Sequence, residues 1–212
     1  WYNSTAGIFK IYKTSTFLSW STGNSLNTAR RALAGAGIQT AALAFGGISQ
    51  PGGVKRTQTE AYNGTNWTEV NDMNAPTARS NLAGAGTQTA ALAFGGFSSP
   101  PTTRHADTET WNGTNWTEVN NLNTGRNSLA GCGTNTAALA FGGYPAPSGN
   151  TELWNGTNWT EVNDLGEERS DIKGAGITTA ALGFGGDDPK TGTTETWNGT
   201  NWTEVNDFNT VR

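Results

Sequence analysis

The decapeptide WNGTNWTEVN occurs at residues 111–120, 154–163 and 197–206, and its variant YNGTNWTEVN occurs at 62–71. Asn-Gly between β-prone segments is a strong β-hairpin signal, because both residues tolerate a positive φ. If Asn-Gly-Thr-Asn forms the whole loop, the two aromatic residues lie directly opposite each other; if only Asn-Gly turns, they lie diagonally. Each copy is predicted to be the outer hairpin of a repeated unit, with the aromatic pairs Tyr62 and Trp67, Trp111 and Trp116, Trp154 and Trp159, and Trp197 and Trp202.

A second repeated stretch precedes each decapeptide and supports the same period. It reads TAALAFGG or TAALGFGG, and the second Trp of the decapeptide recurs after 49, 43 and 43 residues. A repeat of this length indicates stacked supersecondary units. The stretch closes with a glycine doublet that we expect to end a strand, at Gly46, Gly47, Gly95, Gly96, Gly142, Gly143, Gly185 and Gly186.

Each unit is predicted to contain four strands. The first is a run of small residues after an arginine, such as RALAGAG at 31–37; the second is TAALAFGG, and the decapeptide supplies the third and fourth. In the second strand Leu43 and Phe45 point to one face while Ala42 and Ala44 point to the other, because strand side chains alternate. We therefore expect the bulky face of one unit to pack on the Ala and Gly face of the next.

Such a unit cannot bury both of its faces alone, so the units are predicted to stack in a ring as an all-β, β-propeller fold. The whole chain, 1–212, then forms a single domain with an N-terminal hairpin or partial blade at 1–30. Within that segment the expected strands are 8–12 and 17–20. We expect four complete blades plus this partial element, with a five-bladed ring as the alternative; the complete units are 31–79, 80–126, 127–169 and 170–212.

The repeat resembles the Kelch repeat. The shared features are the Gly-Gly doublet after the second strand, an aromatic residue in the third, a Trp in the fourth, and an Arg ten or twelve residues later. The spacing of five residues from the third-strand aromatic to the fourth-strand Trp is slightly shorter than Kelch repeats usually show. The resemblance implies four-stranded propeller blades.

A second resemblance concerns the source. The segment WYNSTAGIFKIYK, at 1–13, looks like the tyrosine-asparagine hairpins of bacteriophage tail fibres, and the repeat arrays are similar to Kelch-like proteins of marine phages. This implies a virion or extracellular appendage. The implied partners are a host cell surface or glycan, or other subunits of the appendage.

Composition argues against several other classes. A net charge of −4 without a cluster of Lys or Arg makes nucleic acid an unexpected partner. No apolar run approaches the roughly 18 residues of a membrane span, so we expect no membrane insertion. One cysteine and one histidine exclude an internal disulfide and a Cys-rich or His-rich metal site, so no metal and no cofactor are expected. The chain begins without Met, which suggests a piece of a longer or processed protein.

The residues that carry chemistry do not form a recognisable catalytic pattern. His105, in SSPPTTRHADT, lacks a nucleophile elbow and is expected to be a solvated loop residue. Cys132 is expected to be a small core residue. The Gly-x-x-Trp of each hairpin is similar to that of sialidases, but the Ser and Asp of their motif are missing. The chain is therefore predicted not to be an enzyme.

Charged residues that recur in every unit are interpreted as part of the construction. One arginine precedes each unit, at Arg30, Arg79, Arg126 and Arg169. Two glutamates flank the aromatic residues of each hairpin, and we expect both to be solvated outer-strand residues rather than the carboxylate pair of a glycosidase. They are Glu60, Glu109, Glu152 and Glu195 in the third strands, and Glu69, Glu118, Glu161 and Glu204 in the fourth.

The units differ mainly in the loops between their second and third strands, at 48–58, 97–107, 144–150 and 187–192. Alternating strand direction places these loops on the same rim as the links that carry the arginines. Variable loops on a rigid scaffold are where binding diversifies. The candidate ligand-binding residues are Lys55, Arg56, Phe97, Arg104, His105, Tyr144 and Lys190.

Three functions remain open on this basis. The first is a non-enzymatic binding module of a virion or cell-surface appendage, of the phage tail fibre type, that recognises a host surface or glycan. The second is a structural or decoration protein that self-assembles through its repeated blades as a homo-oligomer. The third is a propeller enzyme that cleaves glycans.

Overall fold

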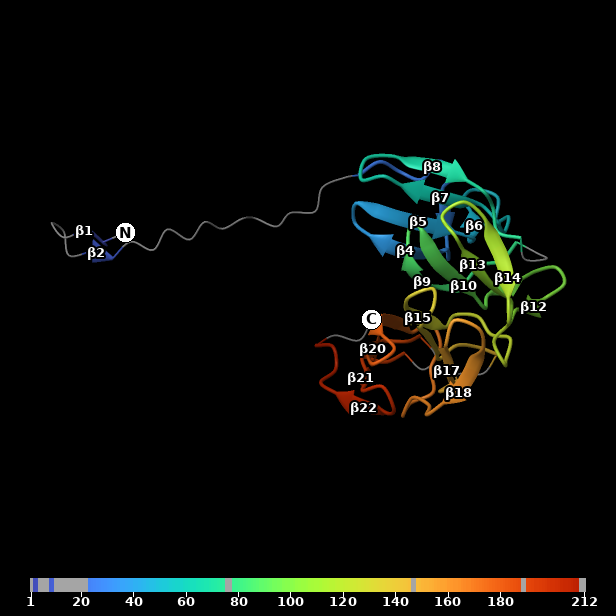
Figure 1. The fold of residues 1–212 in the computed structure, drawn as a ribbon. Helices are drawn as coiled ribbons and strands as arrows, with labels where there is room; N and C mark the ends of the chain where they lie inside the picture. The colour runs from blue at the N-terminus through green and yellow to red at the C-terminus, as the bar shows by residue number, and fades with distance from the viewer. Residues whose placement is uncertain are drawn as a thin grey trace.

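The computed structural model describes residues 2–3, 8–9, 23–74, 78–145, 148–187 and 190–209. These residues form no helix; they form four antiparallel four-stranded sheets arranged as a four-bladed β-propeller (Figure 1). The all-β propeller prediction is confirmed. Of the two strands predicted in the N-terminal partial blade, residues 10–12 of the strand at 8–12 and the whole strand at 17–20 lie outside the described residues.

The blades follow one another along the chain, and in each the strands pair in sequence order from the first to the fourth. Blade 1 contains β4 (Ala34–Ile38), β5 (Ala41–Phe45), β7 (Thr59–Tyr62) and β8 (Trp67–Val70). Blade 2 contains β9 (Ala83–Thr87), β10 (Ala90–Phe94), β13 (Thr108–Trp111) and β14 (Trp116–Val119). Blade 3 contains β15 (Ala130–Gly133), β16 (Ala138–Phe141), β17 (Thr151–Trp154) and β18 (Trp159–Val162). Blade 4 contains β19 (Lys173–Ile177), β20 (Ala180–Phe184), β21 (Thr194–Trp197) and β22 (Trp202–Val205).

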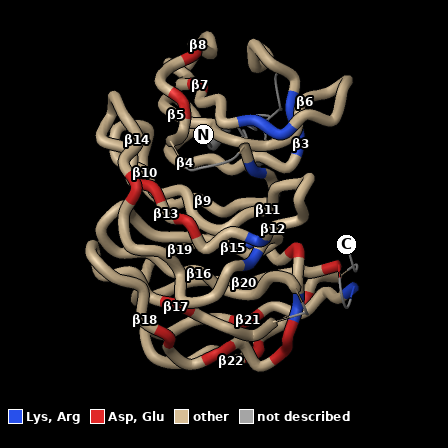
Figure 2. Tube along the Cα trace, turned by 90° about the vertical axis from the view of Figure 1, so that its right-hand side faces the viewer, with Lys and Arg blue, Asp and Glu red and all other residues tan. Residues whose placement is uncertain are grey.

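Three short strand pairs lie outside the blades. β3 (Arg30–Arg31) pairs with β6 (Ile48–Ser49), and β11 (Phe97–Ser98) pairs with β12 (Thr103–Arg104). These four strands lie together on the right-hand side of the molecule in Figure 2, along one rim of the propeller. Near the N-terminus, β1 (Tyr2–Asn3) pairs antiparallel with β2 (Ile8–Phe9).

The outer hairpins resolve the two turn geometries left open by the sequence. Trp111 lies directly opposite Trp116, with ring centroids 5.4 Å apart. The loop is all four residues of Asn-Gly-Thr-Asn, because the Asn112 N–H donates to the Asn115 carbonyl at 3.2 Å. The Asn112 side chain closes the loop further by accepting from the Thr114 and Asn115 N–H groups at 2.9 and 2.8 Å. Such local side-chain bonds explain why asparagine recurs in these turns.

Neighbouring blades pack as predicted, with a bulky face against a flat one. The inner strands β4, β9, β15 and β19 lie side by side in chain order. Phe45 of blade 1 points at Gly84 of blade 2, where an added Cβ would lie 2.7 Å from the Phe45 Cζ atom. Phe94 faces Gly131 and Phe141 faces Gly174 in the same way, with corresponding distances of 2.5 Å. Only glycine fits at these positions, which explains the small-residue first strand.

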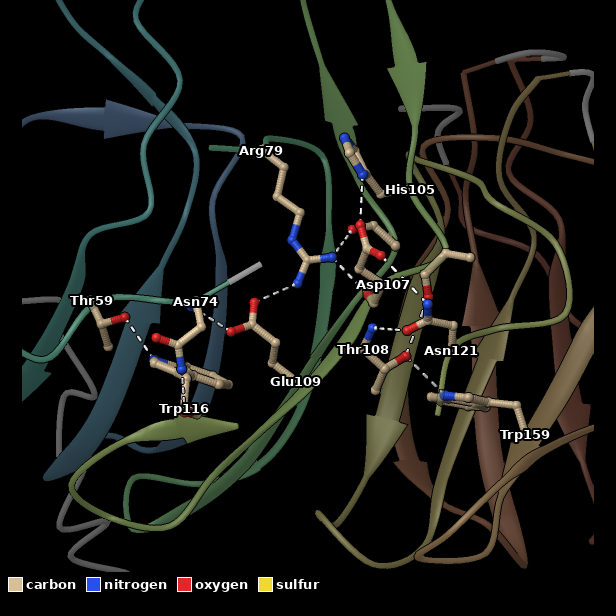
Figure 3. Close-up of polar contacts among 12 residues, drawn as sticks. Thr59, Asn74, Arg79, His105, Asp107, Thr108, Glu109, Trp116, Asn121 and Trp159 are labelled. Carbon is tan, nitrogen blue, oxygen red and sulfur yellow. Dashed lines mark hydrogen bonds and ion pairs between the residues drawn. The ribbon is translucent and has the colours of Figure 1, made fainter. Parts of the chain in front are cut away.

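A tryptophan of the next blade completes each of these interfaces. Trp116 packs on Phe45 with ring centroids 4.9 Å apart, and its Nε1–H donates to the Thr59 hydroxyl of blade 1 at 2.9 Å (Figure 3). Trp159 and Trp202 make the same two contacts with the blades before them. The second Trp of the decapeptide therefore joins two blades, whereas the first bonds within its own blade, as Trp111 Nε1–H does to the Gln88 carbonyl at 3.0 Å.

The repeated arginine also joins two blades. The Arg79 carbonyl accepts from the Gly47 N–H of blade 1 at 2.9 Å. Its guanidinium donates to the Gly95 and Asp107 carbonyls of blade 2 at 2.9 and 2.7 Å and to Glu109 Oε1 at 3.0 Å (Figure 3). Burial lowers the pKa of the Arg79 guanidinium, and the Glu109 carboxylate opposes that shift. The structural interpretation of the arginines is thus supported by their contacts.

The prediction that the third-strand glutamates are solvated is wrong. Glu109 is fully buried, and the same residue type is buried in every blade, in ion pairs between Arg30 and Glu60, Arg79 and Glu109, Arg126 and Glu152, and Arg169 and Glu195. The sequence pattern does not pair the arginine with the glutamate, because the two residues lie about 30 positions apart in the chain. The fourth-strand glutamates are exposed, as predicted.

We expect Glu109→Ala to lower the free energy of unfolding by about 3 to 5 kcal/mol, because it leaves the buried Arg79 charge without its carboxylate. The matched control is Glu118→Ala, at the exposed residue directly opposite in the sheet, which should change stability by less than about 0.5 kcal/mol. Urea denaturation followed by tryptophan fluorescence measures both. Equal effects of the two substitutions would contradict the assignment.

Candidate functional site on the loop rim

The variable loops and the arginine links share one rim, as the sequence predicts. In blade 1 the link strand β3 pairs with β6 at the start of the loop, Arg30 opposite Ser49 and Arg31 opposite Ile48. Single bridges repeat this contact in blades 2 and 3, between Ser80 and Phe97 and between Asn127 and Tyr144. Each loop is therefore anchored to the link that enters its own blade. We call this edge the loop rim: the loops at 48–58, 97–107, 144–150 and 187–192.

Four of the seven predicted site residues form two contacts that bridge successive blades. The Lys55 ammonium lies 4.4 Å from the centroid of the Phe97 ring. The Arg104 guanidinium lies 4.7 Å from the centroid of the Tyr144 ring. Both geometries are those of cation–π interactions, which fix a flexible cationic side chain over an aromatic face. The loops of blades 1, 2 and 3 are thus connected through their side chains.

Two further predicted residues lie on the same rim with different surroundings. The Arg56 guanidinium donates to the Ser49 hydroxyl at 3.3 Å, and its backbone N–H donates to the Gly47 carbonyl at 2.9 Å. Lys190 is exposed and forms a bridge with Asp187 in the short loop of blade 4.

The prediction that His105 is a solvated loop residue is wrong. Only 8% of His105 is exposed, because β11 and β12 fold the loop back over it. Its Nδ1 lies 2.7 Å from Asp107 Oδ2 (Figure 3), and its Nε2 lies 2.8 Å from the Ser98 hydroxyl. The loop's proline and polar composition suggested exposure, and the pairing of its two ends could not be seen in the sequence.

The hydrogen-bond order Ser98, His105, Asp107 is that of the triad used in acyl transfer. Blade 1 provides a comparison within the same chain. There Arg56 bonds Ser49 across the same separation of seven residues, and a guanidinium cannot act as a general base. Because the serine has a cationic or imidazole partner in both loops, its common role is to close the loop. We therefore interpret His105 as a loop-closing residue.

A groove of about 480 Å³ lies between the loops of blades 1 and 2. Val54, Pro100 and Pro101 supply apolar walls, and Lys55 supplies a cation. Ser98 and His105 form part of its lining although both are mostly buried. A groove whose lining contains a cation and hydroxyl groups suits a ligand with acidic or hydroxyl substituents. The sequence identified Lys55 and His105, but it missed Ser98 and the Pro100-Pro101 pair, whose only signal was the unusual Pro-Pro dipeptide.

Three further features of the described residues concern metal ligands, membrane-spanning helices and the single cysteine. They contain no group of three or more His, Cys, Asp or Glu side chains placed to hold a metal ion. No helix long and apolar enough to cross a membrane occurs in the part of the chain that the structure describes. Cys132 is buried on β15, and burial raises the pKa of its thiol to about 12. A thiol with so high a pKa is a poor nucleophile, in agreement with its predicted core role.

We expect the Cys132 thiol to resist alkylation in the folded protein at pH 8, because the reactive thiolate forms in quantity only near pH 12. Denaturation should return the thiol to its ordinary pKa and allow complete labelling. Mass spectrometry after treatment with iodoacetamide, with and without urea, measures the difference. Rapid stoichiometric labelling of the folded chain would contradict the burial of this residue.

We expect His105→Ala to destabilise the protein by about 1 to 3 kcal/mol, because Ser98 and Asp107 lose a buried partner. His105→Arg should cost less, since arginine makes the equivalent serine contact in blade 1. Urea denaturation measures both variants. The alternative triad role is tested by hydrolysis of p-nitrophenyl acetate: a rate that falls when Ser98→Ala is introduced would contradict the loop-closing interpretation.

Comparison with known proteins adds no family. No protein-family model matches this sequence, and no curated protein matches it. The geometry of the described residues is that of a four-bladed β-propeller with one variable, loop-bearing rim.

Proposed function

We propose that this chain is a non-enzymatic binding module of a virion or cell-surface appendage, of the phage tail fibre type, and that it recognises a host-surface glycan. The Kelch-like repeat supplies the rigid scaffold, and the groove between the loops of blades 1 and 2 is the binding site. The observation that carries the proposal is the position of Lys55. It lies on the wall of a groove that is formed by two variable loops and fixed over Phe97.

The charge of this region favours an acidic glycan. The loops 48–58 and 97–107 carry three Lys or Arg residues and one Asp, in a chain that has 13 Lys or Arg and 17 Asp or Glu overall. Figure 2 shows basic residues near β3, β6 and β12, on the loop rim. Lysine and arginine bind carboxylate and sulfate groups by charge-assisted hydrogen bonds. We therefore expect uronic acid, sialic acid or sulfated sugars to bind better than neutral ones.

A second function has its own support. Blades 1 and 4 expose several apolar side chains, among them Ile38, Ile177 and Leu182. Exposed apolar faces of this kind mark association surfaces. A structural protein that assembles through its blades would use these faces and leave the loop rim free.

We expect binding to an acidic glycan on an array, and at least a tenfold loss of affinity with Lys55→Glu. The loss follows because the substitution replaces an attractive charge with a repulsive one at the groove. Lys190→Glu is the matched control, since it makes the same charge change on the same rim in blade 4. Surface plasmon resonance at low and high salt measures the affinities, which should fall as salt rises.

The alternatives give different results. No array signal from monodisperse protein, or equal losses with Lys55→Glu and Lys190→Glu, would contradict the proposal. Reducing sugar released from mixed polysaccharides would instead favour the glycan-cleaving function. Thermal melting of both variants shows whether either substitution acts through unfolding.

A further inference from the structure

The interface that joins successive blades occurs three times. The two faces that would make it once more have no blade against them, although Phe208 contacts Phe184 on blade 4 with ring centroids 5.6 Å apart. Leu43, Leu92 and Leu139 occupy the same position in blades 1 to 3 and are at most 1% exposed. Leu182, their counterpart in blade 4, is 42% exposed. The bulky face of blade 4 is therefore built like the others but lacks a blade against it.

The flat face of blade 1 is open in the complementary way. A Cβ added to Gly84, Gly131 or Gly174 would contact a phenylalanine of the preceding blade. A Cβ added to Gly35 would contact only the Leu43 carbonyl of its own blade. A hollow of about 520 Å³ lies on this face, along β4 and β5 and beside Trp67. A smaller one of about 270 Å³ lies on blade 4 beside Ala175, Ala181 and Leu182. Figure 1 shows β4 and β20 on either side of the open part of the ring.

The hydrogen bonds that join successive blades also stop at blade 1 and at blade 4. A row of backbone hydrogen bonds runs from blade to blade, from Asn81 N–H to the Ala32 carbonyl, from Ser128 to Asn81, and from Asp171 to Ser128, each 2.8 Å long. Among the described residues, nothing donates to the Asp171 carbonyl in this row. The Thr194 hydroxyl of blade 4 likewise has no described tryptophan partner, although Thr59, Thr108 and Thr151 each accept from one.

The outer edge of blade 1, in contrast, is already occupied by the chain itself. The Asn27 N–H donates to Glu60 Oε2 at 2.7 Å, and its side chain donates to the Trp67 carbonyl at 3.1 Å. Asn74 makes the same two contacts with Glu109 and Trp116 of blade 2. Asn24 bonds Asn66 as Asn71 bonds Asn115. Residues 23–30 thus take the place of the link that follows a fourth strand, and their contacts lie on the outer edge of blade 1 rather than on its flat inner face.

We infer that the open faces of blades 1 and 4 bind the inner β-hairpin of a further repeat, carried by a polypeptide other than these 212 residues. The hairpin has the sequence type of the first two strands, LAGAG followed by TAALAFGG. Its inner glycine receives Phe184, and its Leu and Phe side chains cover Gly35 and Ala42. The ring then holds the inner half of a fifth blade between blades 4 and 1.

This occupant fits better than a second copy of the chain. Blade 4 of another copy would bring its own link, from Asn206 onward, to the edge of blade 1. The hydrogen-bonding positions there, on Glu60, Asn66 and the Trp67 carbonyl, are taken by Asn24 and Asn27. A two-stranded hairpin has no such link and meets no competitor. The inference concerns blade faces and does not depend on the proposed glycan site.

The probe is the peptide of residues 79–96, RSNLAGAGTQTAALAFGG, fused to a soluble carrier protein so that its own association does not limit the experiment. We expect saturable binding at one hairpin per chain, a higher melting temperature of the complex, and slower hydrogen exchange in β4 and β20. Changing salt should have little effect, because the contact is mainly apolar. Isothermal titration calorimetry and exchange mass spectrometry measure these quantities.

Two substitutions test the geometry from opposite sides. Gly84→Val in the probe should weaken binding at least tenfold, because it fills the space for Phe184 as it would fill the space for Phe45 in blade 2. Leu182→Glu in the chain should do the same by charging the face of blade 4. Glu204→Gln, an exposed change on the outer strand of the same blade, is the control and should leave binding unchanged.

Three results would overturn the inference. Dimers at micromolar concentration that Leu182→Glu dissociates, without binding of the probe, would identify a second copy as the occupant. Binding only after removal of residues 1–22 would show that the chain covers these faces itself. Binding that Gly84→Val leaves unchanged would show that the probe attaches elsewhere. In each case glycan recognition through Lys55 would remain to be judged on its own measurements.

Discussion

The structure depends on one constraint: a blade with two apolar faces can bury neither without a neighbour. The solution is the same at each of the three interfaces, where a phenylalanine enters the space left by a glycine and a tryptophan of the next blade covers it. An aromatic contact of this type contributes about 0.5 to 1.5 kcal/mol beyond the area it buries. Because the contact is asymmetric, with a bulky side and a flat side, it also gives the array a direction. The exposed ends of the array differ from each other for that reason.

The arginine links provide hydrogen-bond partners for the backbone groups at the end of each inner hairpin. The Gly-Gly doublet turns the chain out of the sheet with positive φ angles, for example 66° and 110° at Gly95 and Gly96. The carbonyl of Gly95 and the N–H of Gly96 would then lack partners inside the protein. The Arg79 guanidinium donates to the Gly95 carbonyl, and the Arg126 carbonyl accepts from the Gly96 N–H. Burying a charge for this purpose requires a carboxylate beside it, which is why Glu109 is inside the blade.

This arrangement places the loop rim on a rigid base. In blades 1 to 3 each variable loop begins directly after a Gly-Gly doublet that is bonded by two arginines, so these loops can change in length without disturbing the packing below them. Contacts such as Lys55 with Phe97 and Arg104 with Tyr144 then connect one loop to the next. The outcome is a surface of coupled loops, one of which closes over the buried pair Ser98 and His105. A groove forms where two long loops meet, between blades 1 and 2.

The sequence by itself determined the repeat, its four strands, the alternation of bulky and flat faces, and hence the propeller. These features follow from local patterns: strand alternation, the turn chemistry of Asn-Gly-Thr-Asn, and the length of the period. Only the tertiary structure decided the partners of the charged residues, because Arg79 and Glu109 meet across 30 residues of chain and His105 is buried by the pairing of strands on either side of it. It also decided which faces stay open, since Leu43 and Leu182 occupy equivalent positions and differ only in whether a blade follows. The exposure of a residue depends on what packs against it. The repeat pattern does not show what lies beside the first and the last blade.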